Sequence, residues 1–340
     1  MNEVSTIGID LAKSVFQAHG ADAAGAVVFR RRLRREKVLE FLAGVPPCVV
    51  AMEACGGAHY WGREIARLGH EVRLIAPIYV KPFVKRQKND AADAEAISEA
   101  AQRPTMRFVA VKSEAKQVSA MAFKVRDLLV RQRTAATNAL RSHMGEFGIV
   151  APAGLCHLER LRRELQAPEG LPKEATALLL EVLATIDRLS AKIAELDKEI
   201  AERARKDETA RRLATIPGVG PVIATALEAM APPVGSFACG RDFAAWMGLT
   251  PRQHSSGGKV RLGRTSKMGQ RSLRRLLVIG ASSVVRWARR KGAPAGSWLA
   301  RMIERKPPML VIMALANKMA RIAWALMAHG GVYRAPAPAA

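Results

Sequence analysis

The chain has 340 residues, of which 49% are hydrophobic, so it is long enough for two or three domains with packed cores. It carries 54 Lys and Arg against 30 Asp and Glu, a formal net charge of +24, and this excess points to a polyanionic partner such as nucleic acid. The four scattered cysteines form no CxxC pair, which argues against a zinc site, and an aromatic content of 5% argues against base stacking as the main binding mode.

The first part of the chain alternates between short apolar runs and helix-like segments. The expected elements are strands at 4–10, 14–19 and 26–30, a helix at 36–42, a strand at 48–53, a helix at 59–68 and a strand at 71–75. Three strands followed by alternating helices and strands predict an α/β layer fold with a mixed sheet. In the ribonuclease-H-like version of this fold, the fourth strand lies beside the first.

Four acidic residues in this region have the spacing of a metal site. Asp10 and Glu53 close two of the apolar runs, and Asp90 and Asp93 lie three apart where a helix begins. Adjacent strands would bring Asp10 and Glu53 together, and residues three apart share one helix face. Carboxylate oxygens bind Mg²⁺ or Mn²⁺, and Mg²⁺ is the usual partner of phosphate. In a basic protein, this cluster predicts metal-assisted chemistry on a nucleic-acid backbone, beside a phosphate-seeking loop at 85–88.

From about Glu114 the sequence becomes strongly helical, and the segment up to Met144 is rich in Lys and Arg. After a break marked by Pro and Gly, apolar residues recur at alternating spacings of four and three, at Val182, Ile186, Leu189, Ile193, Leu196 and Ile200. Such a heptad seam predicts a coiled coil within or between subunits. The competing interpretation is an ordinary amphipathic helix that packs on a core.

The segment 216–221 precedes an apolar helix and resembles a helix-hairpin-helix turn. Gly218 and Gly220 allow close backbone approach, and the N–H groups of the following helix N-terminus can hold a phosphate. The alternative is a plain turn between two helices. Further along, the apolar stretch 310–328 is interrupted by Asn317, Lys318 and Arg321, so we expect a packed helix and not a membrane span.

A second candidate site is the serine–glycine segment between these two regions, which contains Ser255-Ser256-Gly257-Gly258. An exposed serine can approach a phosphate closely, and the flanking cations Arg252, Lys259 and Arg261 can stabilise a pentacovalent phosphorus transition state. Serine needs a base or a nearby metal for activation. His254 is a candidate base, although a loop histidine near phosphate is more often a hydrogen-bond donor. On composition alone, a flexible phosphate-binding loop is the favoured interpretation.

Several short motifs follow one another along the chain: Gly8-Ile9-Asp10-Leu11-Ala12-Lys13, Met52-Glu53-Ala54, Asn89-Asp90-Ala91-Ala92-Asp93-Ala94, Ile216-Pro217-Gly218-Val219-Gly220, Gly248-Leu249-Thr250-Pro251, Ser255-Ser256-Gly257-Gly258, Ser266-Lys267-Met268-Gly269 and Leu273-Arg274-Arg275-Leu276. No single motif is diagnostic, but all of them in this order are highly specific. With them the chain resembles, from end to end, the transposases of the one-ten family of bacterial insertion sequences, in the eleven-eleven branch.

The resemblance implies three regions: a RuvC-like domain with a DEDD tetrad at 1–112, a helical coiled-coil segment at 113–208, and a mainly helical C-terminal transposase domain at 209–335. The tetrad falls on Asp10, Glu53, Asp90 and Asp93, as catalytic residues that bind Mg²⁺, or Mn²⁺ in its place. The catalytic serine falls on Ser256, and the adjacent Ser255 leaves an ambiguity of one residue.

The resemblance also implies partners. We expect DNA recombination guided by a structured bridge RNA that pairs with donor and target DNA, carried out by a homodimer or homotetramer in the bacterial cytoplasm, at the nucleoid, with no membrane partner. The expected nucleic-acid contacts are Gly218, Gly220, Arg252, Lys259, Arg261, Lys267, Arg274 and Arg275.

Two other functions stay open at this point. The first is a RuvC-like, structure-selective DNA nuclease, in which metal-activated water attacks and the serine loop only binds phosphate. The second is a basic nucleic-acid-binding protein without enzymatic activity, whose carboxylates are vestigial. A covalent protein–DNA adduct would separate the recombinase from the nuclease, and a requirement for metal would separate both enzymes from the binding protein.

Overall fold

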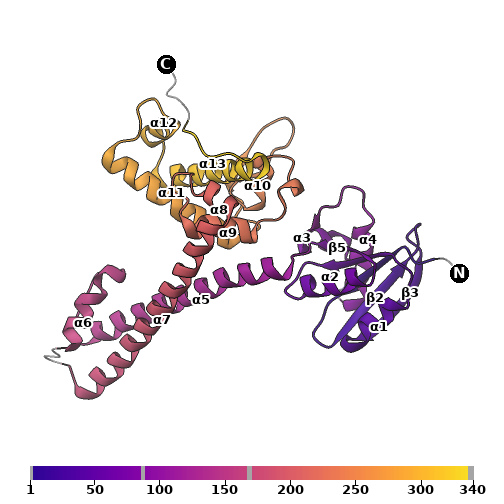
Figure 1. Ribbon diagram of the computed structural model, residues 1–340, viewed down its shortest axis with the longest axis horizontal. Helices are drawn as coiled ribbons and strands as arrows, with labels where there is room; N and C mark the ends of the chain where they lie inside the picture. Colours follow the sequence, from indigo (N-terminus) through magenta and orange to yellow (C-terminus); the bar gives the residue numbers. More distant parts are fainter. Residues whose placement is uncertain (1–2, 86–88, 167–170, 336–340) are drawn as a thin grey trace. The chain divides into compact units, whose positions relative to one another are not determined.

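The computed structural model describes residues 3–85, 89–166 and 171–335 (Figure 1). The chain divides into two compact units, and the division falls between Gln117 and Val118, inside the long helix α5 (Glu114–Glu146). The first predicted boundary, at 112, lies close to this division, whereas the second, at 208, lies inside the second unit. The three-region arrangement stays a prediction.

The first unit is built on a mixed six-stranded sheet in the order β3-β2-β1-β4-β5-β6. Its strands are β1 (Thr6–Asp10), β2 (Val15–Ala21), β3 (Val27–Arg34), β4 (Val49–Glu53), β5 (Glu71–Ile75) and β6 (Phe108–Val109). β1 pairs antiparallel with β2 and parallel with β4, and β4 pairs parallel with β5. The predicted mixed sheet, with the fourth strand beside the first, is confirmed.

Helices cover both faces of this sheet: α1 (Val38–Ala43), α2 (Ala58–Arg67), α3 (Pro77–Val80) and α4 (Asp90–Ala101) (Figure 1). Ile7 and Ile9 of β1 point into the core beneath α1 and α2, together with Val50 and Met52 of β4. Ala51, between those two, belongs to the core beneath α3 and α4. Because strand side chains alternate between faces, residues 8 and 10 of β1 and residues 51 and 53 of β4 all lie on the α4 face.

The strand predicted at 26–30 is longer than expected and continues to Arg34 as β3. β3 forms the edge of the sheet, where its arginines stay exposed while its backbone pairs with β2. Charged side chains are suited to such an edge because they oppose pairing with another strand. The run of arginines therefore concealed the second half of this strand from a prediction based on hydrophobicity.

The second unit is helical apart from one β-hairpin. After α5 come α6 (Leu158–Gln166), α7 (Lys173–Lys206), α8 (Glu208–Leu213), α9 (Pro221–Met230), α10 (Gly240–Trp246), β7 (Pro251–Gln253), β8 (Leu262–Thr265), α11 (Arg271–Lys291), α12 (Trp298–Arg305) and α13 (Pro308–His329). The main core gathers α8 to α13 with the start of α5 and the end of α7. A smaller core joins α6 to the other ends of α5 and α7.

α5 and α7 run antiparallel, since Phe123 shares one core with Ile200 while Leu140 shares the other with Ile186. Between these cores, Arg126 Nη2 donates to Asp197 Oδ2 over 3.1 Å. Within the predicted heptad seam, Ile186, Ile193 and Ile200 are buried, whereas Val182, Leu189 and Leu196 are only half-buried. The chain thus supplies a partner for one side of the seam, and a coiled coil between subunits stays a prediction.

By length and composition, α13 is apolar enough to cross a membrane. Its apolar residues Val311, Met319 and Ala323 are buried in the main core of the unit, where α13 packs beside α10 and α11 (Figure 1). The helix also carries Lys318 and Arg321. These features fit the packed helix that the sequence predicts.

Candidate metal centre and serine hairpin

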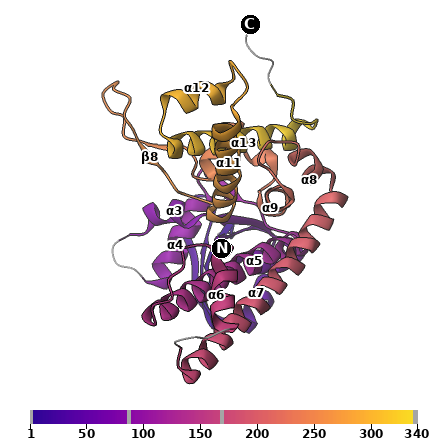
Figure 2. The ribbon, with the colours of Figure 1, turned by 90° about the vertical axis from the view of Figure 1, so that its left-hand side faces the viewer.

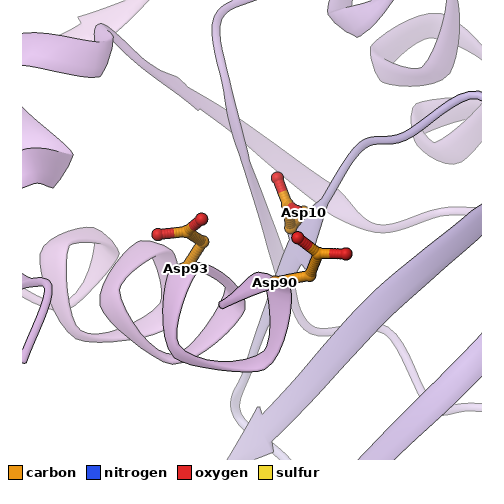
Figure 3. A group of neighbouring side chains, drawn as sticks. All are labelled: Asp10, Asp90 and Asp93. Carbon is orange, nitrogen blue, oxygen red and sulfur yellow. The ribbon is translucent and has the colours of Figure 1, made fainter. Parts of the chain in front are cut away.

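Asp10, Asp90 and Asp93 form an acidic group in the first unit, with one carboxylate oxygen of each within 4.8 Å of the others (Figure 3). Asp10 comes from the end of β1, and the other two come from the first turn of α4. Asp90 is exposed, and Asp10 and Asp93 are half-buried. Three of the four predicted metal ligands therefore lie together.

Two local features hold the first turn of α4 against β1. Gly8 has no side chain, so α4 crosses the strand at the backbone of Ala94 and Ser98, which lies too close to admit a Cβ on residue 8. Asn89 is the N-cap, and its Oδ1 accepts a hydrogen bond of 2.8 Å from the Ala92 N–H. The capped turn presents Asp90 and Asp93 toward the end of β1 (Figure 3).

Glu53, the fourth predicted ligand, ends β4, and the parallel register pairs Met52 with Ile9. Glu53 is therefore beside Asp10 at the carboxyl ends of adjacent strands and on the same face of the sheet. Among the described residues, the group of carboxylates within 4.8 Å does not include Glu53. The structure places it on the neighbouring strand, next to the group and outside it.

These carboxylates suit a hard divalent cation. Oxygen ligands of one octahedral Mg²⁺ lie about 2.1 Å from the ion and so about 3–4 Å from each other. The oxygens of Asp10, Asp90 and Asp93 are already within 4.8 Å, so small side-chain rotations would bring them to that spacing. Three carboxylates this close also repel one another, which favours a bound cation.

An ion-pair network on α4 is centred on Glu95, two residues after Asp93. Glu95 accepts a hydrogen bond of 2.6 Å from Lys85 Nζ and one of 3.2 Å from Arg30 Nη2. The hydrogen bond from Lys85 lowers the pKa of the Glu95 carboxyl. Sequence reasoning misses this network because its members come from β3, α4 and the segment between β5 and α4. Residues 86–88 of the predicted phosphate-seeking loop lie outside the described residues.

The serine segment forms the tip of the β7–β8 hairpin, which stands out from the helices of the second unit (Figure 2). The Lys259 N–H donates to the Ser256 carbonyl over 3.0 Å across a turn made by Gly257 and Gly258. Both glycines have positive φ, at 54° and 74°, as the type I′ turn requires at its two central positions. The two glycines therefore place Ser256 at the first position of a tight turn.

The two serines differ in their hydrogen bonding. Ser255 Oγ accepts from the Arg261 N–H and from Gln253 Nε2, each over 3.1 Å, so its hydroxyl ties the hairpin together. Within the described residues, no hydrogen-bond partner is found for Ser256 Oγ. Ser256, Lys259 and Arg261 are all exposed.

Arg274 of α11 bridges the segment that precedes β7 and the segment that follows β8. Its Nη1 donates to the Met247 carbonyl over 2.8 Å and to the Met268 carbonyl over 2.7 Å. Burial lowers the pKa of the Arg274 guanidinium. Arg275 pairs with Asp127 of α5. Both arginines thus have partners within the chain, and their predicted nucleic-acid contacts stay a prediction.

The predicted helix-hairpin-helix turn lies between α8 and α9. A Cβ on Gly218 would stand 2.8 Å from the Gly280 carbonyl oxygen of α11, so this glycine lets the turn pack closely on that helix. Gly218 also has a positive φ of 84°. Gly220 is the exposed N-cap of α9, and nothing lies within 4 Å of the Cβ it lacks. Packing explains Gly218, and phosphate contact by Gly220 stays a prediction.

Comparison with known proteins matches both units. Residues 7–149 match a family model described as a transposase of the DEDD type of IS110, and residues 210–294 match the model of the "Transposase IS116/IS110/IS902 family". The chain is 48% identical to a "Probable family 20 transposase" of Pseudomonas aeruginosa, with 97% of this chain and 99% of the relative covered.

Two further relatives are named for insertion sequences. The chain is 41% identical to the transposase of IS1328 from Yersinia enterocolitica, which covers 98% of this chain and 99% of the relative. It is 38% identical to the transposase of IS1111A from Coxiella burnetii, over 98% of this chain and 92% of the relative. Full-length similarity of this kind, together with an acidic group in the matched DEDD region, shows that the chain belongs to the IS110 family of insertion-sequence transposases, enzymes that recombine DNA.

Proposed function

We propose that this transposase cuts and rejoins DNA with a Mg²⁺ site formed by Asp10, Glu53, Asp90 and Asp93 and with Ser256 as the nucleophile. The observation that carries the proposal is the convergence of Asp10, Asp90 and Asp93 from two separate elements. A basic chain has little reason to hold three carboxylates so close unless a cation balances them. The net charge of +24 supports a DNA partner for that cation.

The chain's residues have separate tasks in this reaction. Asp10, Asp90 and Asp93 hold the ion, and Glu53, from the neighbouring strand on the same face, offers a fourth carboxylate. When bound, Mg²⁺ supplies Lewis-acid stabilisation of negative charge on a phosphoryl oxygen. The Asn89 cap and the close approach at Gly8 keep the ligands of α4 and β1 in register.

Ser256 is the better candidate for attack because its hydroxyl is exposed and Ser255 is committed to the hairpin. In the proposed step, a bond forms between Ser256 Oγ and the scissile phosphorus, and the phosphodiester bond to the next nucleotide breaks. The serine hydroxyl gives up one proton and the departing strand end takes up one to become a hydroxyl, so the step consumes no proton overall. The phosphoserine link retains the energy of the broken bond, so rejoining needs no ATP.

Exposed cations flank the nucleophile. Lys259 follows the turn, and Arg261 lies on the returning arm of the hairpin, where its N–H also binds Ser255. Positive charge beside the serine would stabilise the extra negative charge of a pentacovalent phosphorus. These side chains support the proposal that the hairpin tip binds the scissile phosphate and attacks it.

We extend the proposal to a guide RNA and to a homodimer or homotetramer. Support for RNA comes from the basic stretch of α5, which includes Lys116, Lys124 and Arg131. Support for subunit pairing comes from Val182, Leu189 and Leu196, which leave one side of the α7 seam half-buried. A heptad seam with an incomplete partner fits a further helix.

The test is a denaturing gel of labelled DNA incubated with protein, Mg²⁺ and guide RNA. A phosphoserine intermediate gives a protein–DNA adduct that survives denaturant and disappears with protease. Ser256→Ala should lose both adduct and cleavage. Ser255→Ala is the matched control and should retain an adduct at a reduced level, because it loosens the hairpin without removing the nucleophile.

The possible outcomes discriminate clearly. If Ser256→Ala still cleaves at a normal rate, water is the nucleophile and a RuvC-like nuclease replaces the recombinase. If Ser255→Ala alone abolishes the adduct, the covalent mechanism holds and the nucleophile is Ser255. EDTA should abolish cleavage by the unaltered protein if a metal is required.

A further inference from the structure

A cleft in the second unit has a volume of about 1050 Å³ and is not used by the proposed chemistry. It lies between one side of α13, the start of α12 and the base of the β7–β8 hairpin. Arg264 and Thr265 of β8 line it from the hairpin, and Trp298 lines it from α12. A cleft of this size can take a nucleotide with its phosphate.

The floor of the cleft is formed by α13. Met313, Asn317 and Arg321 recur every four residues and line the cleft, whereas Ala316 and Ala320 of the same helix are buried. Asn317 is fixed in place because its Nδ2 donates to the Leu249 carbonyl over 3.2 Å. Its Oδ1 therefore remains as an acceptor, at a position set by the fold.

The charge of the cleft has one sign. Arg264, Lys318 and Arg321 line it, and no Asp or Glu is among its described lining residues. Arg264 and Arg321 are exposed and Lys318 is half-buried, so all three can meet an anion. A cleft with three cations and no acid is complementary to phosphate.

The cleft also contains aromatic rings, although the chain has few of them. Trp298 and Trp324 are both half-buried lining residues. Lys318 Nζ lies 4.6 Å from the ring centroid of Trp298, and Trp324 Nε1 donates to the Val234 carbonyl over 3.4 Å. An indole ring beside cations is the combination that binds a base and its phosphate in single-stranded nucleic acid.

We propose that this cleft binds one unpaired nucleotide of the nucleic acid on which the enzyme acts. The base stacks on Trp298, and the phosphate pairs with Arg264 and Arg321. The acceptor of Asn317 and the hydroxyl of Thr265 are available to the base edge. A paired base does not fit this description, because its faces are already stacked within the duplex.

The cleft is at the base of the same hairpin that carries Ser256 at its tip. A nucleotide held there would fix the strand relative to the hairpin while neighbouring nucleotides reach the tip. The inference rests on the action of the chain on DNA and does not require Ser256 to be the nucleophile.

The test compares two DNA duplexes of one sequence, one of which carries a single extrahelical 2-aminopurine, with the full-length protein. We expect binding about tenfold tighter for the bulged duplex, and quenching of the 2-aminopurine fluorescence as the base stacks on indole. Trp298→Leu and Arg321→Gln should each remove most of this preference. Arg321 is exposed, so Arg321→Gln reports on the cleft even if Trp298→Leu is poorly folded by circular dichroism.

Matched controls lie outside the cleft in the same unit. Trp287→Leu removes an exposed tryptophan of α11, and Arg305→Gln removes an exposed arginine at the end of α12. Both should keep the preference for the bulge. A second comparison uses the same bulge in an RNA duplex. Tighter binding of the bulged DNA or of the bulged RNA shows from which nucleic acid the cleft takes its nucleotide.

Equal binding of bulged and paired duplexes by the unaltered protein, in both DNA and RNA, overturns the inference. So does a preference that survives in folded Trp298→Leu and in Arg321→Gln. Formation of the Ser256 adduct without a bulge preference would refute the cleft alone, so the two proposals can fail separately.

Discussion

Gly8 of β1 lies directly against Ala94 of α4: a Cβ on residue 8 would stand 2.3 Å from the Ala94 carbonyl oxygen and 2.5 Å from the Ser98 nitrogen. Both atoms belong to the helix backbone, which cannot rotate away as a side chain can. The contact therefore sets the distance between β1, which ends in Asp10, and the first turn of α4, which carries Asp90 and Asp93.

Gly8→Ala should consequently impair the metal site without touching a ligand. The added methyl group must push α4 away from β1, which costs about 1–3 kcal/mol of folding free energy as an overpacked core does. We expect weaker Mn²⁺ binding by titration calorimetry and slower DNA cleavage. Gly56→Ala is the control, because a Cβ there meets nothing within 4 Å. Unchanged Mn²⁺ affinity in Gly8→Ala would show that the contact does not control the site.

Removal of a carboxylate should abolish cleavage and leave the fold intact. In Asp10→Asn or Glu53→Gln the site loses a ligand, and the mutual repulsion of the remaining carboxylates also falls. We therefore expect the melting temperature in metal-free buffer to be equal or higher, measured by circular dichroism, while cleavage is lost. Glu36→Gln, an exposed acid outside the site, is the control. Full activity of Asp10→Asn would rule out the proposed metal site.

Arg274→Met should loosen the base of the serine hairpin. It leaves the carbonyls of Met247 and Met268 without their guanidinium donor, and a hydrogen bond to a charged group contributes about 2 kcal/mol. We expect a lower free energy of unfolding in urea and a smaller yield of adduct. Arg290→Met, an exposed arginine on the same helix, is the comparison. Equal stability of the two variants would contradict a positioning role for Arg274.

The exposed cations of the hairpin should contribute to the salt dependence of DNA binding. The double variant Lys259→Gln, Arg261→Gln should reduce the slope of log K against log salt by about 2, since each lost phosphate contact releases about 0.9 fewer ions. The measurement is fluorescence anisotropy with a duplex over a range of salt concentrations. The control is the double variant Lys198→Gln, Lys206→Gln, which removes two positive charges from α7. If both pairs change the slope equally, the hairpin has no special contact with phosphate.

His19 should make the unfolding free energy depend on pH. It is buried in β2 and, among the described residues, its Nδ1 has no hydrogen-bond partner. Burial lowers the pKa of His19 below 6.5, with Arg30 and Lys85 lowering it further and Glu95 opposing them. A lowered pKa means that the folded state disfavours the proton, so stability is full above about pH 6.5 and falls as the pH drops through the folded-state pKa.

His19→Leu should flatten that dependence between pH 7 and pH 5, a range about the ordinary histidine pKa. Urea unfolding at several pH values measures it, with His143→Gln, an exposed histidine of α5, as the control. Identical pH profiles for His19→Leu and the unaltered protein would mean that His19 titrates normally in the folded state.

Local patterns in the sequence were enough to predict those parts of the candidate metal site that lie within a single strand or helix. The alternation in β1 and β4 puts Asp10 and Glu53 at strand ends on one face, and Asn89 before Asp90 marks a helix start with Asp93 one turn on. Charge indicated nucleic acid, and the succession of motifs indicated the family. Each of these signals depends on neighbours along the chain, or on composition, and needs no knowledge of packing.

Only the tertiary structure showed which side chains and backbone atoms are in contact after folding. The contact of Gly8 with Ala94, the two carbonyls held by Arg274, and the hydroxyl of Ser255 bound within the hairpin could not be foreseen from spacing. The same holds for the cleft, whose lining residues come from α12, α13 and the β7–β8 hairpin. Such contacts join residues that become neighbours only after folding. Hydrophobic periodicity and residue type specify the helices and strands. Which of these elements pack against each other depends on steric fit and on the hydrogen bonds that buried polar groups require.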